Sequence, residues 1–405
     1  MNNSYCVLPW LGISVDPDGS IKPCCESLYH FTKDDGSKFN LGADKIEDIY
    51  NSTDFLNMRT SMLKGNPVLG CESCYKNEAV TGRSSRTKNN AHWKIKFTEP
   101  TADINIKYFD LRFGNLCNLM CRSCNPRNSS QLEKELKSLS HTNISNYIAP
   151  GYDYDINQWY LTDTFDKNME SQINNISWLY ITGGEPTIVE KNIEFLEKLI
   201  TSGRSKSITL SFNTNMTNTK PKFYELIKEF KKVICIASID GYDDMQEYLR
   251  YPSDWNQIDN NFKKLIDMGD PIQMLPTVVI QATNLGKIVD LFEYFENFNR
   301  IANKTVAEIA IIILQYPSYS SLIHLPVDYK IKCWERIQEW MQTKCKYQSM
   351  QFYISMAGLK KMCYTNELSK HNIKKYKDFN SLLDSTRGHQ LKNVNLELYN
   401  LIQDI

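Results

Sequence analysis

The sequence lacks a net charge and lacks any long apolar segment. Its 405 residues hold 47 Lys and Arg against 47 Asp and Glu, so the overall charge indicates no polyanionic partner such as nucleic acid. No apolar run approaches the ~20 residues that a membrane span requires. The N-terminal residues Met1-Asn2-Asn3-Ser4-Tyr5 have neither the charged nor the apolar region of a signal peptide. We therefore expect a cytoplasmic protein with no membrane association.

Cysteine, in contrast, is abundant. Twelve cysteines in a chain expected to be cytoplasmic favour metal ligation over a disulfide framework. Eight of them cluster in the first third of the sequence, at Cys6, Cys24, Cys25, Cys71, Cys74, Cys117, Cys121 and Cys124. The others are scattered, and we expect them to be small buried hydrophobic residues: Cys235, Cys333, Cys345 and Cys363.

The first motif is a cysteine triad with C-x3-C-x2-C spacing, formed by Cys117, Cys121 and Cys124. It follows an apolar run over residues 108–113 that is typical of a β-strand. Cysteine thiolates are the usual ligands of iron–sulfur clusters. Because a cubane has four irons, three cysteines leave one iron with an open coordination position, and an open position marks a reactive metal site.

The second motif is a group of cysteines around a predicted β-hairpin. Short runs at 12–15 and 21–23 flank Asp16-Pro17-Asp18-Gly19, a turn sequence that would bring Cys6 and Cys24 together. After a helix expected near residues 45–50, Gly70-Cys71-Glu72-Ser73-Cys74 adds a C-x2-C pair. The sequence thus predicts a four-thiolate site for zinc or an iron–sulfur cluster, with Cys25 as the alternative to Cys24.

The rest of the chain alternates between strand and helix patterns. Strands are expected at 108–113, 177–182, 207–213, 233–239, 275–281 and 308–315, and helices after Ser129 or Ser130 and at 189–202, 221–231, 256–268 and 284–298. This alternation predicts an α/β fold with a parallel sheet. Six units with polar strand ends favour a partial (β/α)6 barrel whose active site lies at the carboxyl edge of the strands.

Domain boundaries follow from these patterns. We expect a small cluster domain of hairpin plus helix, with a linker, over 1–100, the barrel over 101–316, and a helical C-terminal extension over 317–405 that begins with an amphipathic helix at 325–344. Residues 140–175 look like an insertion. The basic stretch 76–96 is expected to be a solvated linker, with contact to an anionic substrate or RNA as the alternative.

Polar and glycine-rich motifs follow several predicted strands. Gly183-Gly184-Glu185-Pro186 ends the second strand, and glycine lets a backbone approach a ligand closely. Later strand ends supply hydroxyl, amide and carboxylate groups and an arginine that can form paired hydrogen bonds with a carboxylate: Asn213, Asn215, Ser238, Asp240 and Arg250. For Asn, Asp and Gly at such positions, turn formation is the alternative role.

The cysteine triad and the Gly-Gly-Glu-Pro motif together resemble the radical S-adenosylmethionine (radical SAM) family. The resemblance implies a [4Fe–4S] cluster on Cys117, Cys121 and Cys124 whose open iron binds S-adenosylmethionine (SAM). It also implies contacts to SAM from Gly183, Gly184, Glu185, Asn213, Asn215, Ser238, Asp240 and Arg250. Family members often carry an aromatic residue before the third cysteine, which packs on the adenine ring; here that residue is Ser123.

The N-terminal segment is similar to an auxiliary-cluster domain of the twitch/SPASM type. Cys6, Asp18-Gly19, Cys24, Gly42 and the Cys71-x2-Cys74 pair carry this resemblance. It implies a second [4Fe–4S] cluster, ligated by Cys6, Cys24, Cys71 and Cys74. The domain usually follows the barrel, whereas here it precedes it.

The resemblance implies an enzyme that cleaves SAM reductively, with an electron from flavodoxin or ferredoxin, and abstracts a hydrogen atom from a substrate. Twitch and SPASM relatives often crosslink, epimerise or oxidise peptides, so we expect a peptide or protein residue as substrate, although no winged-helix peptide-binding module is evident. A small molecule such as an aminocyclitol or sugar is the alternative. No catalytic residue is predicted; Cys333, Cys363 and tyrosines are candidates for a hydrogen donor.

A non-enzymatic interpretation of the sequence is an iron–sulfur or zinc protein that binds a partner or transfers electrons. Such a protein needs a closed shell of four ligands, which the cysteine triad does not supply from its own neighbourhood. It also gives no role to Gly183-Gly184-Glu185-Pro186.

Overall fold

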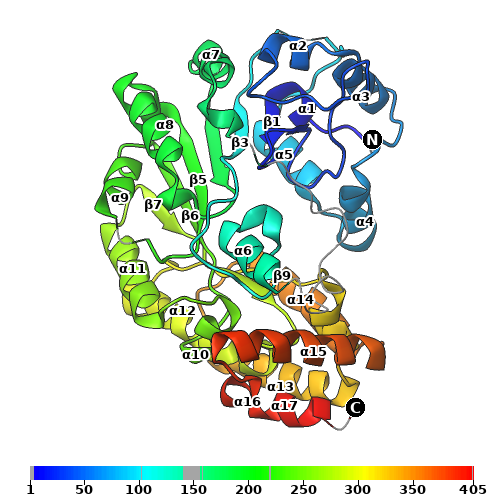
Figure 1. The fold of residues 1–405 in the computed structure, drawn as a ribbon, viewed down its shortest axis with the longest axis vertical. Helices are drawn as coiled ribbons and strands as arrows, with labels where there is room; N and C mark the ends of the chain where they lie inside the picture. Colours follow the sequence, from blue (N-terminus) through cyan, green and yellow to red (C-terminus); the bar gives the residue numbers. More distant parts are fainter. Residues whose placement is uncertain (1–3, 102, 140–155, 157, 219, 404) are drawn as a thin grey trace. The chain divides into compact units, whose positions relative to one another are not determined.

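The computed structural model describes residues 4–101, 103–139, 156, 158–218, 220–403 and 405. The chain forms two compact units (Figure 1). The first unit comprises 1–116, 153–212 and 220–233, and the second comprises 117–152, 213–219 and 234–405. The predicted insertion at 140–175 falls partly outside the described residues.

A parallel sheet with one antiparallel edge strand organises the first unit. Its strands are β1 (Gly12–Val15), β2 (Ile21–Lys22), β3 (Tyr108–Arg112), β4 (Trp178–Thr182) and β5 (Thr209–Thr214). β2 pairs antiparallel with β1, and β1, β3, β4 and β5 run parallel. The register aligns Ile13 with Phe109 and Phe109 with Leu179, so the buried apolar side chains share one face.

The predicted hairpin forms one edge of the main sheet. All four residues of β1 are buried, and the strand pairs with β2 on one edge and with β3 on the other. Because this pairing occupies both edges of the strand, the N-terminal segment joins the main sheet.

The described residues of the first unit also form eight α-helices. They are α1 (Leu8–Leu11), α2 (Ile46–Tyr50), α3 (Thr53–Leu63), α4 (Glu72–Thr81), α5 (Ser85–Trp93), α7 (Asp163–Gln172), α8 (Glu190–Thr201) and α9 (Pro221–Ile227). Short 3-10 turns occur at η3 (Trp159–Leu161), η4 (Pro186–Ile188) and η5 (Arg204–Ser207).

The stretch 76–96 is folded, contrary to the expectation of a solvated linker. It forms the end of α4 and all of α5, which begins with a reciprocal capping box between Ser84 and Thr87. The Arg86 side chain is buried, where Nη1 donates to the Tyr5 carbonyl at 2.8 Å and Nε donates to Glu78 Oε1 at 2.9 Å. One arginine of the basic stretch thus has internal partners.

The second unit contains β6 (Lys232–Ala237) from Ile234 onward, β7 (Ile272–Met274), β8 (Thr277–Ile280) and β9 (Ala310–Ile313). The strand order of the main sheet is β2-β1-β3-β4-β5-β6-β7, and β8 pairs parallel with β9. A bridge between Ser238 and Thr277 links the end of β6 to β8. The α/β fold with a mostly parallel sheet is confirmed, whereas the partial (β/α)6 barrel stays a prediction.

Helices make up most of the second unit. They are α6 (Ser130–Ser138), α10 (Asp244–Leu249), α11 (Trp255–Met268), α12 (Ile288–Ala302), α13 (Val327–Thr343), α14 (Met350–Tyr364), α15 (Lys370–Arg387), α16 (Leu391–Val394) and α17 (Leu396–Gln403). Single 3-10 turns lie at η1 (Pro126–Asn128), η6 (Leu285–Lys287), η7 (Ser318–Ser320) and η8 (Leu322–His324). Figure 1 shows α13, α15, α16 and α17 gathered near the C-terminus.

Buried side chains confirm two expectations for this unit. Trp334, Ile337 and Trp340 form the buried stripe of α13, and Cys235, Cys333 and Cys363 are buried. Cys345 is only half-buried, with its Sγ 3.4 Å from the Tyr353 hydroxyl. Among the helices of the described ranges, none has both the length and the apolar character needed to cross a membrane.

Arg59 provides a stability test of the first unit. Its side chain is fully buried, Nε donates to the Pro9 carbonyl and Nη1 to the Tyr50 carbonyl, both at 2.9 Å. Hydrogen bonds from a charged donor contribute roughly 1.5–3 kcal/mol each. We expect Arg59→Met to lower the free energy of unfolding by about 3 kcal/mol in urea titrations followed by circular dichroism.

The matched control is Lys206→Met, because the Lys206–Glu229 ion pair is exposed and such pairs contribute less than about 1 kcal/mol. Equal losses for the two variants would contradict the structural role of Arg59.

Candidate functional site

The loop of residues 117–124, here called the cysteine loop, gathers the predicted triad in the second unit. Cys117 and Cys121 are buried together with Leu119, and Cys124 packs against them. Burial, together with the neighbouring Cys121 and Cys117, raises the pKa of the Cys124 thiol to about 12. Thiols in such surroundings stay protonated at neutral pH unless a cation stabilises the thiolate.

Backbone hydrogen bonds hold the cysteine loop in place. The Met120 amide donates to the Tyr251 carbonyl at 2.6 Å, and the Arg122 amide donates to the Leu249 carbonyl at 2.9 Å. On the other side, Ser129 Oγ, which also caps α6, donates to the Leu119 carbonyl at 2.6 Å. The loop is thus fixed between the end of α10 and the start of α6.

Arg250 brings a positive charge to the triad. Its Nε donates to Asp240 Oδ2 at 2.8 Å, and its Nη1 lies 3.9 Å from Cys121 Sγ. Asp240 is fully buried, and its Oδ1 accepts a hydrogen bond from the Val279 amide at 2.8 Å. Both carboxylate oxygens are therefore engaged, and Asp240 orients the guanidinium beside Cys121.

An amide and hydroxyl network joins the cysteine loop to the end of β5. Asn215 Nδ2 donates to Asn118 Oδ1 at 2.9 Å, and Asn118 Nδ2 donates to Thr217 Oγ1 at 2.7 Å. Asn215 Oδ1 in turn accepts from the Thr217 hydroxyl at 2.6 Å. Thr217 and Asn118 were not singled out from the sequence.

Ser238 lies next to Thr214 at the adjacent strand end, since its amide donates to the Thr214 carbonyl at 2.8 Å. Asn213 directly precedes Thr214 and is half-buried. Of the predicted residues of the second unit, the structure thus joins Arg250 and Asp240 to Cys121, and Asn215 to Asn118.

The Gly-Gly-Glu-Pro turn belongs to the first unit and packs against the residues that precede the cysteine loop. A Cβ at Gly184 would lie 2.0 Å from the Leu116 carbonyl oxygen, and Gly183 has a φ of +116°. The Glu185 amide donates to the same Leu116 carbonyl at 2.8 Å. Only glycine fits at this close approach, because any side chain would collide with the Leu116 carbonyl. Cys117 follows Leu116 directly, so the turn packs on the residue before the triad.

The Glu185 side chain is buried and has a local role as well. Its Oε1 accepts hydrogen bonds from the Thr187 hydroxyl at 2.6 Å and from the Thr187 amide at 3.2 Å. These bonds cap the short turn η4, so they fix the carboxylate at the end of β4.

The four predicted auxiliary ligands converge on one pocket of the first unit. It is lined by Cys6, Leu8, Cys24, Glu26, Gly70, Cys71, Ser73, Cys74, Ser85 and Arg86. Cys25 is exposed and does not line this pocket. Burial raises the pKa of Cys6 to about 12 and that of Cys71 to about 11, in both cases with a further contribution from neighbouring cysteines.

A glycine brings the two cysteine segments of this pocket together. Gly70 has a φ of +84°, and a Cβ there would lie 2.5 Å from both Ser27 Oγ and Tyr29 Cβ. The turn before Cys71 therefore packs directly on the segment that follows Cys24. Arg86, from the stretch expected to be a linker, completes the wall and was missed by sequence reasoning.

The four auxiliary cysteines line one common pocket. In the described ranges, no set of three or more His, Cys, Asp or Glu side chains converges on a point that could hold one metal ion. In a cubane each thiolate binds a different iron, so its ligands need not converge on one point. Both groups of cysteines fit a cluster in their chemistry and burial.

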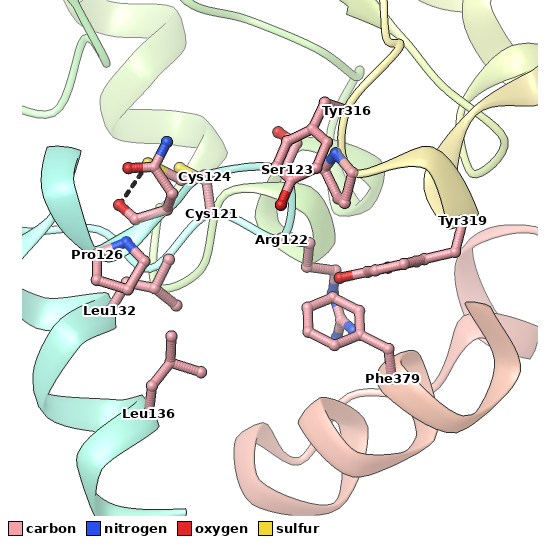
Figure 2. A pocket seen from close by; sticks show the side chains of 12 residues that line it. Cys121, Arg122, Ser123, Cys124, Pro126, Leu132, Leu136, Tyr316, Tyr319 and Phe379 are labelled. Atoms are coloured by element: carbon pink, nitrogen blue, oxygen red, sulfur yellow. Dashed lines mark hydrogen bonds between the residues drawn. The ribbon is translucent and has the colours of Figure 1, made fainter. Parts of the chain in front are cut away.

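A second pocket lies on the cysteine loop itself (Figure 2). It is lined by residues 121–126 of the loop and its continuation, by Leu132 and Leu136 of α6, and by Tyr316, Pro317, Tyr319 and Phe379. Tyr316 is 58% exposed. Ser123, which replaces the expected aromatic residue, thus shares a pocket with three aromatic side chains that no sequence motif identified.

Comparisons with known proteins agree with these two cysteine centres. Residues 111–295 match the radical SAM superfamily, and residues 6–75 match the SPASM iron–sulfur cluster-binding domain. The chain therefore carries a radical SAM domain, and a SPASM domain lies at its N-terminal side. Its cofactors are [4Fe–4S] clusters and SAM.

No curated protein matches the chain. Among solved structures, SuiB of Streptococcus suis bound to SAM is 14% identical, with 59% of this chain and 48% of that chain covered and a TM-score of 0.37. The structure of anSMEcpe with bound SAM and the Cp18Cys peptide is 16% identical, with 60% of this chain and 62% of that chain covered and a TM-score of 0.39. SuiB bound to its precursor peptide SuiA is 13% identical, with 85% of this chain and 74% of that chain covered and a TM-score of 0.35.

The chain thus covers about half of SAM-bound SuiB and about three fifths of anSMEcpe. All three TM-scores lie below 0.5, so these structures are only distantly similar to the chain.

The auxiliary site generates a test of ligand identity. Because Cys71 lines the pocket and Cys25 does not, we expect Cys71→Ala to lose about four of about eight irons after anaerobic reconstitution, and Cys25→Ala to lose none. Iron and sulfide analysis with Mössbauer spectroscopy measures both variants. Loss of iron from Cys25→Ala would instead assign that thiol to the cluster.

Proposed function

We propose that this chain cleaves SAM at a [4Fe–4S] cluster bound by Cys117, Cys121 and Cys124, and abstracts a hydrogen atom from a peptide or protein residue. The observation that carries the proposal is the packing of these three cysteines in one buried loop with the Arg250 guanidinium at Cys121. When bound, the cluster and SAM supply the electron and the 5′-deoxyadenosyl radical. The protein binds and orients these groups and excludes water from them.

Arg250 is the residue we assign to the SAM carboxylate. Its guanidinium is held by Asp240 and reaches Cys121, so a carboxylate bound beside the cluster would come within its range. Arginine forms paired hydrogen bonds with carboxylates. Asp240, whose oxygens already have partners, would act through Arg250.

We assign the other SAM contacts according to the strand end at which each residue lies. Gly183, Gly184 and Glu185 would receive the amino group of SAM, which is supported by their packing on the residue before Cys117. Asn213 and Ser238 would contact the ribose hydroxyls. Asn215 is bonded to Asn118 and Thr217, so we assign it the role of bracing the cysteine loop.

The second cluster would be bound by Cys6, Cys24, Cys71 and Cys74. It would accept an electron from the product radical, ligate the substrate, or brace the fold. The proposed division of the chain into 1–100, 101–316 and 317–405 accommodates the matched SPASM and radical SAM segments. A flavodoxin or ferredoxin as reductant and a cytoplasmic location belong to the same proposal.

A peptide substrate is favoured over a sugar by the pocket on the cysteine loop. Leu132, Leu136, Tyr316, Tyr319 and Phe379 give it an aliphatic and aromatic wall. Such a wall suits an apolar side chain, whereas an aminocyclitol or sugar requires many polar partners. Oxidation or rearrangement of a small molecule is the second candidate.

Anaerobic reconstitution tests the first step. We expect about eight irons per chain, the sum of two cubanes, and formation of 5′-deoxyadenosine after addition of SAM and dithionite. Cys121→Ala should abolish 5′-deoxyadenosine and retain about four irons, because it removes a ligand of one cluster only. Chromatography of the nucleoside and iron analysis measure the two effects.

The matched control is Cys345→Ala, since Cys345 is half-buried and distant in sequence from both cysteine groups. A Cys121→Ala variant that still forms 5′-deoxyadenosine would contradict the ligand assignment. To separate the substrate classes, a peptide fraction and a metabolite fraction of a cell extract are compared for stimulation of 5′-deoxyadenosine formation.

A further inference from the structure

Arg122 lies between two of the three cysteines of the triad and is almost completely buried, with 4% of its surface exposed. Its backbone amide is bonded to Leu249, as described above. The guanidinium points away from the cysteine thiols, toward the C-terminal helix α15, whose Phe379 lines the same pocket (Figure 2). A buried arginine at this position requires partners for its charge.

The partners of Arg122 come from α10 and α15. Nε donates to the Tyr248 carbonyl at 2.9 Å, and the guanidinium lies 3.7 Å from the centre of the Tyr248 ring. Nη1 donates to Asn380 Oδ1 at 2.9 Å, and Nη2 pairs with Asp384 Oδ1 at 2.5 Å. Three nitrogens of the Arg122 side chain, and the packing of its guanidinium on the Tyr248 ring, thus join the loop to two helices.

The same two acceptors on α15 are themselves fixed. Asn380 Nδ2 donates to the Tyr376 carbonyl at 2.8 Å, and Asp384 Oδ2 accepts from the Leu391 amide at 3.0 Å. Asn380 and Asp384 are four residues apart on one helix, so both face the loop from one side of α15. The acceptors therefore present a rigid surface to the guanidinium.

A buried guanidinium with geometrically matched acceptors specifies one arrangement of the groups that it joins, because any displacement leaves a charge without partners. We propose that Arg122 is a positioning residue: through it, α15 sets the conformation of the cysteine loop and thereby the environment of the cluster bound there. The inference rests on the proposed ligand role of Cys117, Cys121 and Cys124.

Two substitutions weaken this connection in different ways. Asp384→Asn keeps the shape of the side chain and removes its charge, and Arg122→Lys keeps the charge and removes the planar fork. Tyr376→Phe is the matched control, since it removes a buried hydrogen bond of the same helix, 2.7 Å long, to Thr283 and not to the loop. All three variants are compared by thermal unfolding with the wild-type chain.

The first readout uses the metal-free full-length chain and iodoacetamide. We expect Cys121 and Cys124 to be alkylated about tenfold faster in Asp384→Asn than in the wild type, which corresponds to ~1.4 kcal/mol of easier loop opening. Mass spectrometry follows each site, and buried Cys235 of β6 serves as internal reference. Tyr376→Phe should leave the ratio of Cys121 to Cys235 alkylation unchanged.

The second readout is the electron paramagnetic resonance spectrum of the reduced, reconstituted protein with and without SAM. We expect changed g-values in Arg122→Lys and Asp384→Asn and wild-type values in Tyr376→Phe. Equal acceleration at Cys121 and Cys235 in all variants, or wild-type rates and spectra in Asp384→Asn, would overturn the positioning role. Retention of both clusters in Cys121→Ala would overturn the ligand assignment separately, while the alkylation ratios would still decide the role of Arg122.

Discussion

The parallel pairing of β1 with β3 is the constraint on which the rest of the first unit depends. Its register places Ser14 opposite Asp110, and the Ser14 hydroxyl donates to Asp110 Oδ2 at 2.7 Å. Arg112, at the end of β3, reaches Asp16 at the end of β1, with 3.2 Å between Nη1 and Oδ1. Since β1 continues through its turn to Cys24, this ladder positions one of the segments that supply the auxiliary cysteines.

Burial of thiols and of arginines is the second common theme. Burial raises the pKa of Cys6, Cys71 and Cys124, so these thiols are neutral in the metal-free protein. Arg250 lies beside Cys121 and Arg86 lines the auxiliary pocket, and each has a hydrogen-bonding acceptor that fixes its position. Such fixed cations favour the thiolate form of the neighbouring cysteines.

Local patterns in the sequence predicted most elements and the membership of both cysteine groups. Strands β3, β4, β5, β6, β8 and β9 and the buried stripe of α13 follow from hydrophobic periodicity, which is a local property. The partner of β1 could not be predicted in this way, because a turn sequence specifies the hairpin with β2 but not the neighbour on the other edge. β7 was missed since its three residues are too short for a periodic pattern.

Side chains that act over long sequence distances were also missed. Arg86 looked like one of several solvated basic residues, and only the fold shows its contact with Tyr5, 81 positions earlier. The contact between Arg122 and Asp384 spans 262 positions. Periodicity gives no information on such pairs, although an arginine between two ligand-spaced cysteines is a signal that could have drawn attention to Arg122.

The place of the SPASM domain has a consequence for how this architecture can change. Two neighbouring parallel strands need a crossover connection, and here the crossover between β1 and β3 contains nearly the whole auxiliary domain. A chain shortened to residues 101–405 would lose β1 and expose the hydrogen-bonding edge of β3. The auxiliary domain thus contributes β1 and β2 to the main sheet, and exchange of this domain between proteins as an independent module would remove both strands.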